Sequence, residues 1–261
     1  MNTKLNKILL LLFVATASLF TACKDDDDDT PTPPGPTVLP KLFIEMDHLA
    51  GATKFYLDST YTTANGDQFT ASVFKYYVSN IRLVKTDNSV VTIPDTYFLV
   101  NAEEESSLTL SMDSLPLGLY KSIKFMIGVD SARNVSGSQT GALDPVNGMF
   151  WTWNSGYIFL KLEGTSPAIS SSNFTYHIGG FQGAIVNYKE VELDFEGDIL
   201  TLNYNKAPEL HFVVDVLEIF ENPTTINMAT FPAIVMSPNA NAATLATNYS
   251  DMIKYDHMHE E

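Results

Sequence analysis

The sequence GMFWTWNSGYIFLKLEG, residues 148–164, is the most informative stretch of the chain. It contains both tryptophans of the protein, Trp151 and Trp153, followed by a run rich in aromatic and apolar residues. Alternate side chains of a β-strand point to one face, so a single strand would place both indoles on the same side. The apolar parity shifts around residues 154–156. We therefore expect a β-bulge there, which would let Trp151 and Ile158 face the same interior.

Strand patterns recur on both sides of this stretch. Residues 42–48 alternate in polarity, and residues 69–84 predict a long strand that bends near Ser79 and Asn80. Shorter strands are expected at residues 55–57, 90–93, 97–100, 108–110, 120–129, 174–180, 191–195, 199–202 and 210–219. About a dozen short strands indicate an all-β domain, a β-sandwich of Greek-key or immunoglobulin-like type with long loops. A closed barrel is the second choice. Residues 244–253 predict one short helix before an extended C-terminal tail.

The N-terminus predicts export and a lipid anchor. Residues 1–22 carry two lysines, an apolar run and small residues, which is typical of a secretory signal. They lead into FTAC, which resembles a bacterial lipobox and makes Cys23 the expected lipidation site. Residues 23–40 hold five aspartates and a proline-rich spacer, as in surface lipoproteins of the Bacteroidetes type. We expect residues 41–261 to form one domain, anchored to the outer membrane and facing the periplasm or the cell surface.

Charge and motif content narrow the function classes. A formal net charge of −16 disfavours nucleic acid as a partner and suits metal ions or cationic proteins. The sequence has no P-loop, no G-x-S-x-G, no H-E-x-x-H and no C-x-x-C motif. Its single cysteine lies in the expected anchor. We therefore expect a binding protein rather than an enzyme, and a hydrolase is a distant alternative.

Two histidines lie in predicted strands that could form a metal site. His48 follows Met46 on the apolar face of residues 42–48, where an imidazole needs a partner. His177 lies in the aromatic strand FTYHIGG, residues 174–180, beside two glycines that allow close approach. Imidazole suits copper and zinc, and the thioether of Met46 adds softness suited to Cu(I).

The other three histidines lie nearer the C-terminus. His257 and His259 are two residues apart, so an extended tail could present both to one ion. His211 lies within the apolar run 210–214, and we interpret it as structural. Most histidines on strands are structural, so none of these positions is specific by itself.

The segment of residues 130–147 has the composition of a long turn and leads directly into the tryptophan stretch. Long ordered loops in compact domains are often functional. Its oxygen-bearing side chains, Asp130, Asn134, Asp144 and Asn147, could bind Ca²⁺, but no EF-hand spacing is present. We favour turn capping by these residues over calcium.

Several stretches in a fixed order resemble the MbnP-like family of copper-binding proteins. The matching stretches are residues 69–83, 128–134, 141–145, 149–164 and 176–180. The resemblance implies a secreted, copper-responsive protein. In some members, and in related proteins of the CorA/MopE type, a tryptophan oxidised to kynurenine joins two histidines around Cu(I). A diheme peroxidase similar to MauG is the usual oxidising partner.

Carried over to this chain, the resemblance makes Trp151 or Trp153 the modified residue, and the sequence does not choose between them. We expect His48 and His177 as the imidazole ligands, and His257 with His259 as a second or alternative site. The protein would sequester or deliver Cu(I). One rival is a surface glycan-binding lipoprotein that uses both tryptophans as a stacking platform. The other is a protein substrate or partner of a diheme peroxidase that stores no metal.

Overall fold

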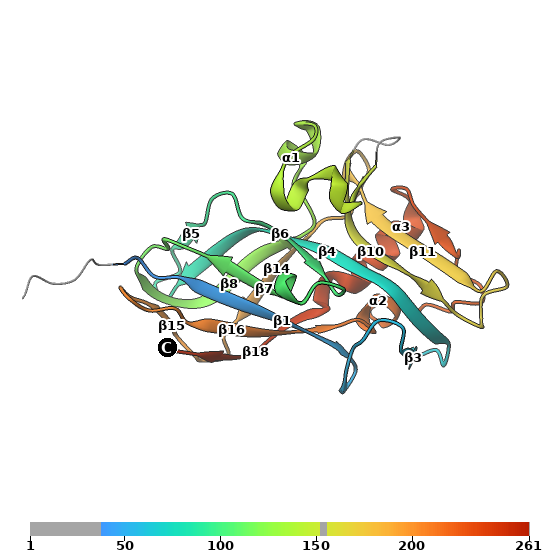
Figure 1. The fold of residues 1–261 in the computed structure, drawn as a ribbon, viewed down its shortest axis with the longest axis horizontal. Helices are drawn as coiled ribbons and strands as arrows, with labels where there is room; N and C mark the ends of the chain where they lie inside the picture. Colours follow the sequence, from blue (N-terminus) through green and yellow to red (C-terminus); the bar gives the residue numbers. More distant parts are fainter. Residues whose placement is uncertain (1–37, 152–155, 261) are drawn as a thin grey trace, which may run out of the picture. The chain divides into compact units, whose positions relative to one another are not determined.

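The computed structural model describes residues 38–151 and 156–260. The expected signal, the expected lipidation site Cys23, the acidic run and most of the spacer lie outside these residues, and so does Trp153. In the described part the chain is mostly β-structure with a few short helices (Figure 1). That confirms the prediction of a mostly β protein. None of the described helices is long and apolar enough to cross a membrane.

The described strands form a smaller and a larger sheet, together with a separate hairpin. The smaller sheet has the order β18-β16-β1-β2, with β7 also paired to β1. Its strands are β1 (Leu42–Ala50), β2 (Thr53–Lys54), β7 (Thr109–Met112), β16 (Glu209–Asp215) and β18 (Ile253–His259). Strands β1 and β16 are parallel, and β18 lies antiparallel to β16 at the edge. The hairpin pairs β12 (Phe181–Gln182) with β13 (Ile185–Val186).

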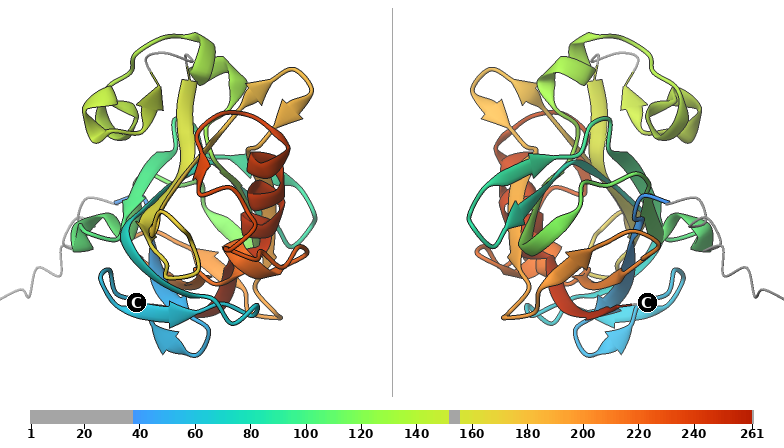
Figure 2. Two further views of the ribbon diagram at one scale, coloured as in Figure 1. Left: turned by 90° about the vertical axis from the view of Figure 1, so that its right-hand side faces the viewer. Right: turned by 90° about the vertical axis from the view of Figure 1, so that its left-hand side faces the viewer.

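The larger sheet has the order β14-β8-β4-β10-β11-β17 along its main path. These strands are β4 (Gln68–Lys85), β8 (Gly118–Ile127), β10 (Gly156–Thr165), β11 (Asn173–Gly179), β14 (Lys189–Asp194) and β17 (Ile234–Val235). Five short strands pair at its margins: β3 (Thr60–Thr62), β5 (Val90–Thr92), β6 (Tyr97–Asn101), β9 (Phe150–Trp151) and β15 (Leu200–Leu202). This sheet curls in the manner of half a barrel (Figure 2). The finer assignment to a Greek-key or immunoglobulin-like sandwich stays a prediction.

The main core lies between the inner faces of the two sheets. Alternate residues of β1, such as Ile44 and Met46, and of β16, such as Phe212, belong to the same buried cluster as Tyr76 of β4 and Tyr176 of β11. The short helices are α1 (Ser131–Val135), α2 (Glu218–Glu221) and α3 (Ala240–Asn248), with 3₁₀ turns at Glu105–Ser107, Gly141–Leu143, Pro145–Asn147 and Tyr249–Asp251. Buried residues of α2 and α3 close this core.

A second buried cluster covers the opposite face of the large sheet, which we call its outer face. Tyr77 of β4 and Phe159 of β10 belong to it, as do Leu143 and Met149 from the segment before the tryptophan stretch. The predicted loop of residues 130–147 therefore contains α1 and two 3₁₀ turns, and part of it packs on this outer face. Trp151 is a member of the same cluster.

The tryptophan stretch forms a hairpin rather than the bulged single strand that we expected. Trp151 of β9 pairs antiparallel with Gly156 of β10, and Phe150 pairs with Tyr157. The backbone N–H of Ile158 also donates to the carbonyl oxygen of Met149 at 2.8 Å. A reversal of the chain accounts for the shift in apolar parity as well as a bulge does, and Trp151 and Ile158 are both buried.

Two other predictions are refined. Strand β4 changes register beyond Ser79, and Asn80 has a left-handed φ of 55°, at the place where we expected a bend. The C-terminal helix begins earlier than predicted, because the side chain of Asn239 accepts from the backbone N–H of Ala242 and so caps it. The expected extended tail is strand β18, hydrogen-bonded to β16.

Candidate metal-binding sites

Trp151 and His177 lie on the outer face of the large sheet. On β11, Phe174, Tyr176 and Ile178 belong to the main core, so His177 and Gly179 point the other way. A Cβ added to Gly179 would lie 2.7 Å from Cζ3 of Trp151. The indole therefore packs directly on the backbone of Gly179, one same-face position beyond His177. Two of the sequence-predicted site residues therefore lie on the same face of the large sheet.

One nitrogen of His177 is held and the other is not. Its Nε2 lies 2.6 Å from Oε1 of Glu163, a residue of the neighbouring strand β10. Its Nδ1 is buried and has no hydrogen-bond partner among the described residues. Burial lowers the pKa of His177, against the opposing effect of Glu163. A neutral imidazole that donates from Nε2 to a carboxylate keeps the lone pair of Nδ1 for a metal ion.

Trp151 is buried, with 4% of its surface exposed. A small pocket lies beside it, lined by Gly156 and Tyr157 of β10 and by Gly180, Phe181, Gln182 and Pro238. Gly179 matters here because any side chain at this position would collide with the indole and with the carbonyl oxygen of Tyr157, 2.6 Å away. The close approach that the glycines beside His177 suggested is thus real. The partner in that approach is Trp151.

His48 does not belong to this site. Its Nε2 lies 3.0 Å from the hydroxyl of Tyr76, and its ring packs edge-on against Phe55, Phe74 and Tyr76 in the main core. Phe74 and Tyr76 face inward, whereas His177 faces outward. The predicted pairing of His48 with His177 is therefore wrong, because the sheet separates the two rings. Met46 is likewise buried in the main core.

Burial strongly disfavours the charged form of His48. Desolvation and the nearby Lys54 lower its pKa from 6.5 to about 4, with Asp47 opposing. The ring is neutral at physiological pH, and its hydrogen bond to Tyr76 gives it a partner in the core. The ordinary structural role explains this histidine fully.

The C-terminal histidines do meet, and they meet His211. His257 is the register partner of His211 across β16 and β18, and the two rings stack with centroids 4.3 Å apart. One ligand nitrogen from each of His211, His257 and His259 lies within 4.8 Å of the others. Our interpretation of His211 as merely structural missed this cluster. The available signal was that His211 alternates with the buried Leu210 and Phe212, which turns it outward.

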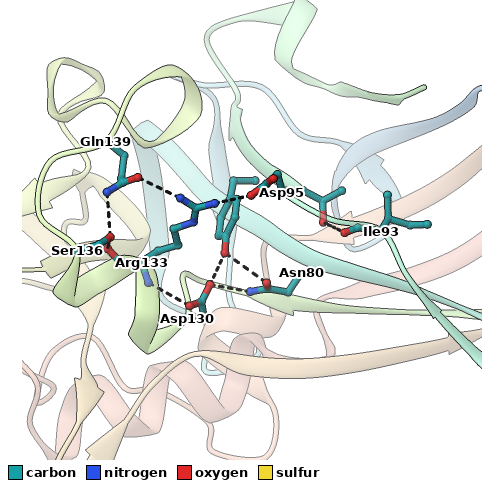
Figure 3. A network of polar contacts seen from close by, with 9 residues as sticks. Asn80, Ile93, Asp95, Asp130, Arg133, Ser136 and Gln139 are labelled. Atoms are coloured by element: carbon teal, nitrogen blue, oxygen red, sulfur yellow. Dashed lines mark hydrogen bonds and ion pairs between the residues drawn. The ribbon is translucent and has the colours of Figure 1, made fainter. Parts of the chain in front are cut away.

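The loop carboxylates cap and brace local structure. Asp130 accepts from the backbone N–H of Arg133 at the start of α1, and it also accepts from Asn80 and from the hydroxyl of Tyr97 (Figure 3). Asp144 caps the following 3₁₀ turn by accepting from the N–H of Val146. Among the described residues, these carboxylates join no cluster of metal-ligating groups. These contacts fit the capping interpretation.

The described part of the chain is a mostly β protein, and His211, His257 and His259 form a group of side chains able to hold a metal ion. The MbnP family model matches residues 40–237. The chain therefore belongs to the MbnP family, which is associated with copper. It is also similar to the solved structure of MbnP from Methylosinus trichosporium, at 14% identity and a TM-score of 0.47, covering 84% of this chain and 98% of that one. No curated protein matches the sequence.

Proposed function

We propose that the protein is an extracytoplasmic copper-binding protein that holds Cu(I) beside Trp151 and His177. The observation that carries this proposal is the buried Nδ1 of His177, which has no partner among the described residues while Glu163 holds Nε2. Both residues lie within the stretch that matches the copper-associated family. The protein would sequester or deliver the ion and would not catalyse turnover.

The chemistry of the donors fits copper on one condition. Imidazole is a good copper ligand, whereas an intact indole is a poor one. Oxidative opening of an indole would supply an aromatic amine and a carbonyl as further donors. The role of Trp151 is supported by the packing of its ring on Gly179, which lies two residues beyond His177 on the same face of β11. Trp153, the alternative residue for this modification, lies outside the described residues.

The oxidising partner and the location belong to the same proposal. A diheme peroxidase of the MauG or cytochrome c peroxidase-like class would supply the oxidation, and the acidic net charge of the chain suits a basic redox partner.

The lipobox-like sequence at Cys23 would anchor the protein to the outer membrane, at the periplasmic or outer surface. Replacing Cys23 with serine should move the protein from the membrane fraction to the soluble fraction. Unchanged membrane association of the Cys23→Ser variant would contradict a lipid anchor at Cys23.

The glycan-binding rival is weakened by the burial of Trp151. A stacking platform needs exposed ring faces, and this ring is 4% exposed and packed on Gly179. The peroxidase-partner rival without stored metal predicts a mass change on the tryptophan peptide with no copper bound. Copper analysis separates it from the proposal.

The direct test is Cu(I) affinity, measured by competition with a chromophoric chelator on protein from the native host. Replacing His177 with alanine should weaken binding at least tenfold without unfolding the domain. The matched control is His48→Gln, because His48 lies on the other side of the sheet and should not change affinity. Equal affinity for wild type and His177→Ala would exclude His177 from the site.

A further inference from the structure

Three histidines and several carboxylates share the solvent face of the smaller sheet. Across parallel β1 and β16, Glu45 is the register partner of His211. Across β16 and β18, His211 pairs with His257, and Glu209 pairs with His259. The side chains that alternate with these, such as Leu210 and Met258, pack against the main core. The imidazoles therefore form a row along β16 and the edge strand β18, next to acidic residues of β1.

A β-bulge brings the two tail histidines onto this face. The register between β16 and β18 shifts by one residue at this point. His211 of β16 pairs with His257 of β18, and the next residue of β16, Phe212, pairs with Tyr255. Asp256 is the additional residue. In a regular strand Tyr255 and His257 would point the same way. Here Tyr255 packs inward against Phe212, and His257 stacks outward on His211. Bulges that re-aim a side chain are frequent at sheet edges and functional sites.

The distance between the Nε2 atoms of His257 and His259 matches that of a metal centre, whereas the stacked rings of His211 and His257 would have to turn for both to bind one ion. Nε2 of His257 and Nε2 of His259 are 3.2 Å apart. In a tetrahedral site with metal–nitrogen bonds of 2.0–2.1 Å, two ligand nitrogens are about 3.3–3.4 Å apart. Nε2 of His211 is buried and has no hydrogen-bond partner among the described residues, although its side chain is 14% exposed overall. A third imidazole nitrogen therefore lies in the same cluster, with Oε2 of Glu209 3.8 Å away.

Carboxylates hold the far nitrogens of two of these rings. Oε2 of Glu45 lies 3.0 Å from Nδ1 of His211, and Oδ2 of Asp256 lies 2.8 Å from Nδ1 of His257. Each Nδ1–H can donate to its carboxylate, which fixes the tautomer whose Nε2 carries the lone pair. Metal-ligating histidines almost always have such an outer partner. A hydrogen bond between two surface histidines does not by itself require such a carboxylate on the far nitrogen of the ring.

We propose that His211, His257 and His259 form a second metal site, which takes a borderline divalent ion such as Zn²⁺ or Cu²⁺ through three Nε2 atoms. Imidazole nitrogen is the donor that these ions prefer. Oε2 of Glu209 lies 3.8 Å from Nε2 of His211, close enough to serve as the fourth ligand of the ion. If Glu209 does not bind, water takes the fourth position. The surrounding Glu45, Asp47 and Asp256 offset the charge of a dication. The side chains of His257 and His259 are exposed, so the ion can exchange with solvent.

This site is separate from the copper site of the proposed function. It lies on the smaller sheet, whereas Trp151 and His177 lie on the outer face of the larger one. His257 and His259 also fall beyond the region that matches the family model, which ends at residue 237. Either proposal can therefore fail while the other stands.

The test is isothermal titration of Zn²⁺ into the chelator-stripped, full-length processed protein. We expect one Zn²⁺ per chain for wild type and at least a tenfold loss of affinity for His211→Ala and for His257→Ala/His259→Ala. Glu260→Gln, an exposed neighbour of His259 outside the cluster, should bind Zn²⁺ within twofold of wild type. Circular dichroism would verify that each variant is folded.

X-ray absorption at the zinc edge supplies a second readout that does not depend on a variant. We expect three imidazole nitrogens at about 2.0–2.1 Å. Wild-type affinity in the double variant, or a zinc shell without imidazole, would overturn the proposal. Loss of Cu(I) binding in His177→Ala with Zn²⁺ titration unchanged would support two separate sites.

Discussion

At the level of single residues, the side of the sheet decides what each histidine can do. His48 is surrounded by aromatic rings and hydrogen-bonded to a tyrosine. His177 has a carboxylate on one nitrogen and, within the described part of the chain, no hydrogen-bond partner on the other. His211, His257 and His259 face solvent together. The sequence could show that His177 and the tail histidines stand in promising positions. It could not show that His48 and His177 are separated, because alternation identifies the faces of one strand but not which faces of two strands meet.

The buried His48 predicts that stability falls in acid. Its pKa of about 4 in the fold lies below the 6.5 of the unfolded chain. Between these values the unfolded state binds more protons, so the free energy of unfolding falls as pH drops, by about 3 kcal/mol in total from this group. Urea denaturation at several pH values from 7.5 to 4 measures the effect. His48→Gln, which cannot titrate, should show a flatter profile, and profiles of equal slope would contradict this account of His48.

Glu163 is a positioning residue for His177. Replacing it with glutamine removes the charge that fixes Nε2–H and should weaken Cu(I) binding by about 10–100-fold, as is typical for outer partners of metal-ligating histidines. Chelator competition measures the affinity, and aspartate at the same position should recover part of it. A fully retained affinity in Glu163→Gln would show that the hydrogen bond does not prepare the ligand.

At the level of elements, the tryptophan hairpin and strand β11 hold the proposed copper site together. The change of parity near residues 154–156 was visible in the sequence, but a bulge and a chain reversal produce the same change. Only the pairing of β9 with β10 distinguishes them. The same limit applies to His211, whose outward direction could be read from alternation, while its register with His257 could not.

Gly179 is the contact on which the element-level account depends. An added Cβ would lie 2.6 Å from the carbonyl oxygen of Tyr157 and 2.7 Å from the ring of Trp151. Gly179→Ala should therefore cost about 1–3 kcal/mol of unfolding free energy and should displace the indole, weakening Cu(I) binding as well. Denaturant titration and chelator competition measure the two effects. Thr175→Ser, on the same face of β11, is the mild control, and wild-type behaviour of Gly179→Ala would refute the packing.

At the level of the whole molecule, the chain combines a predicted membrane anchor with a domain that has candidate metal sites on two different sheets. The mostly β character followed from local alternation and turn signals. The pairing of β1 with β16, which joins the beginning of the domain to a strand near its end, did not follow, because local patterns do not specify long-range neighbours. That pairing places Glu45 beside His211, so the proposed second metal site depends on topology that the sequence alone does not reveal.

The copper content of the protein from its native host tests the central claim most directly. Elemental mass spectrometry should be done on chains that carry His257→Ala/His259→Ala, so that the tail cluster contributes no ion. The account predicts about one copper per chain in this background and its loss when His177→Ala is added. Copper absent from this background after growth in excess copper, or retained without His177, would contradict it.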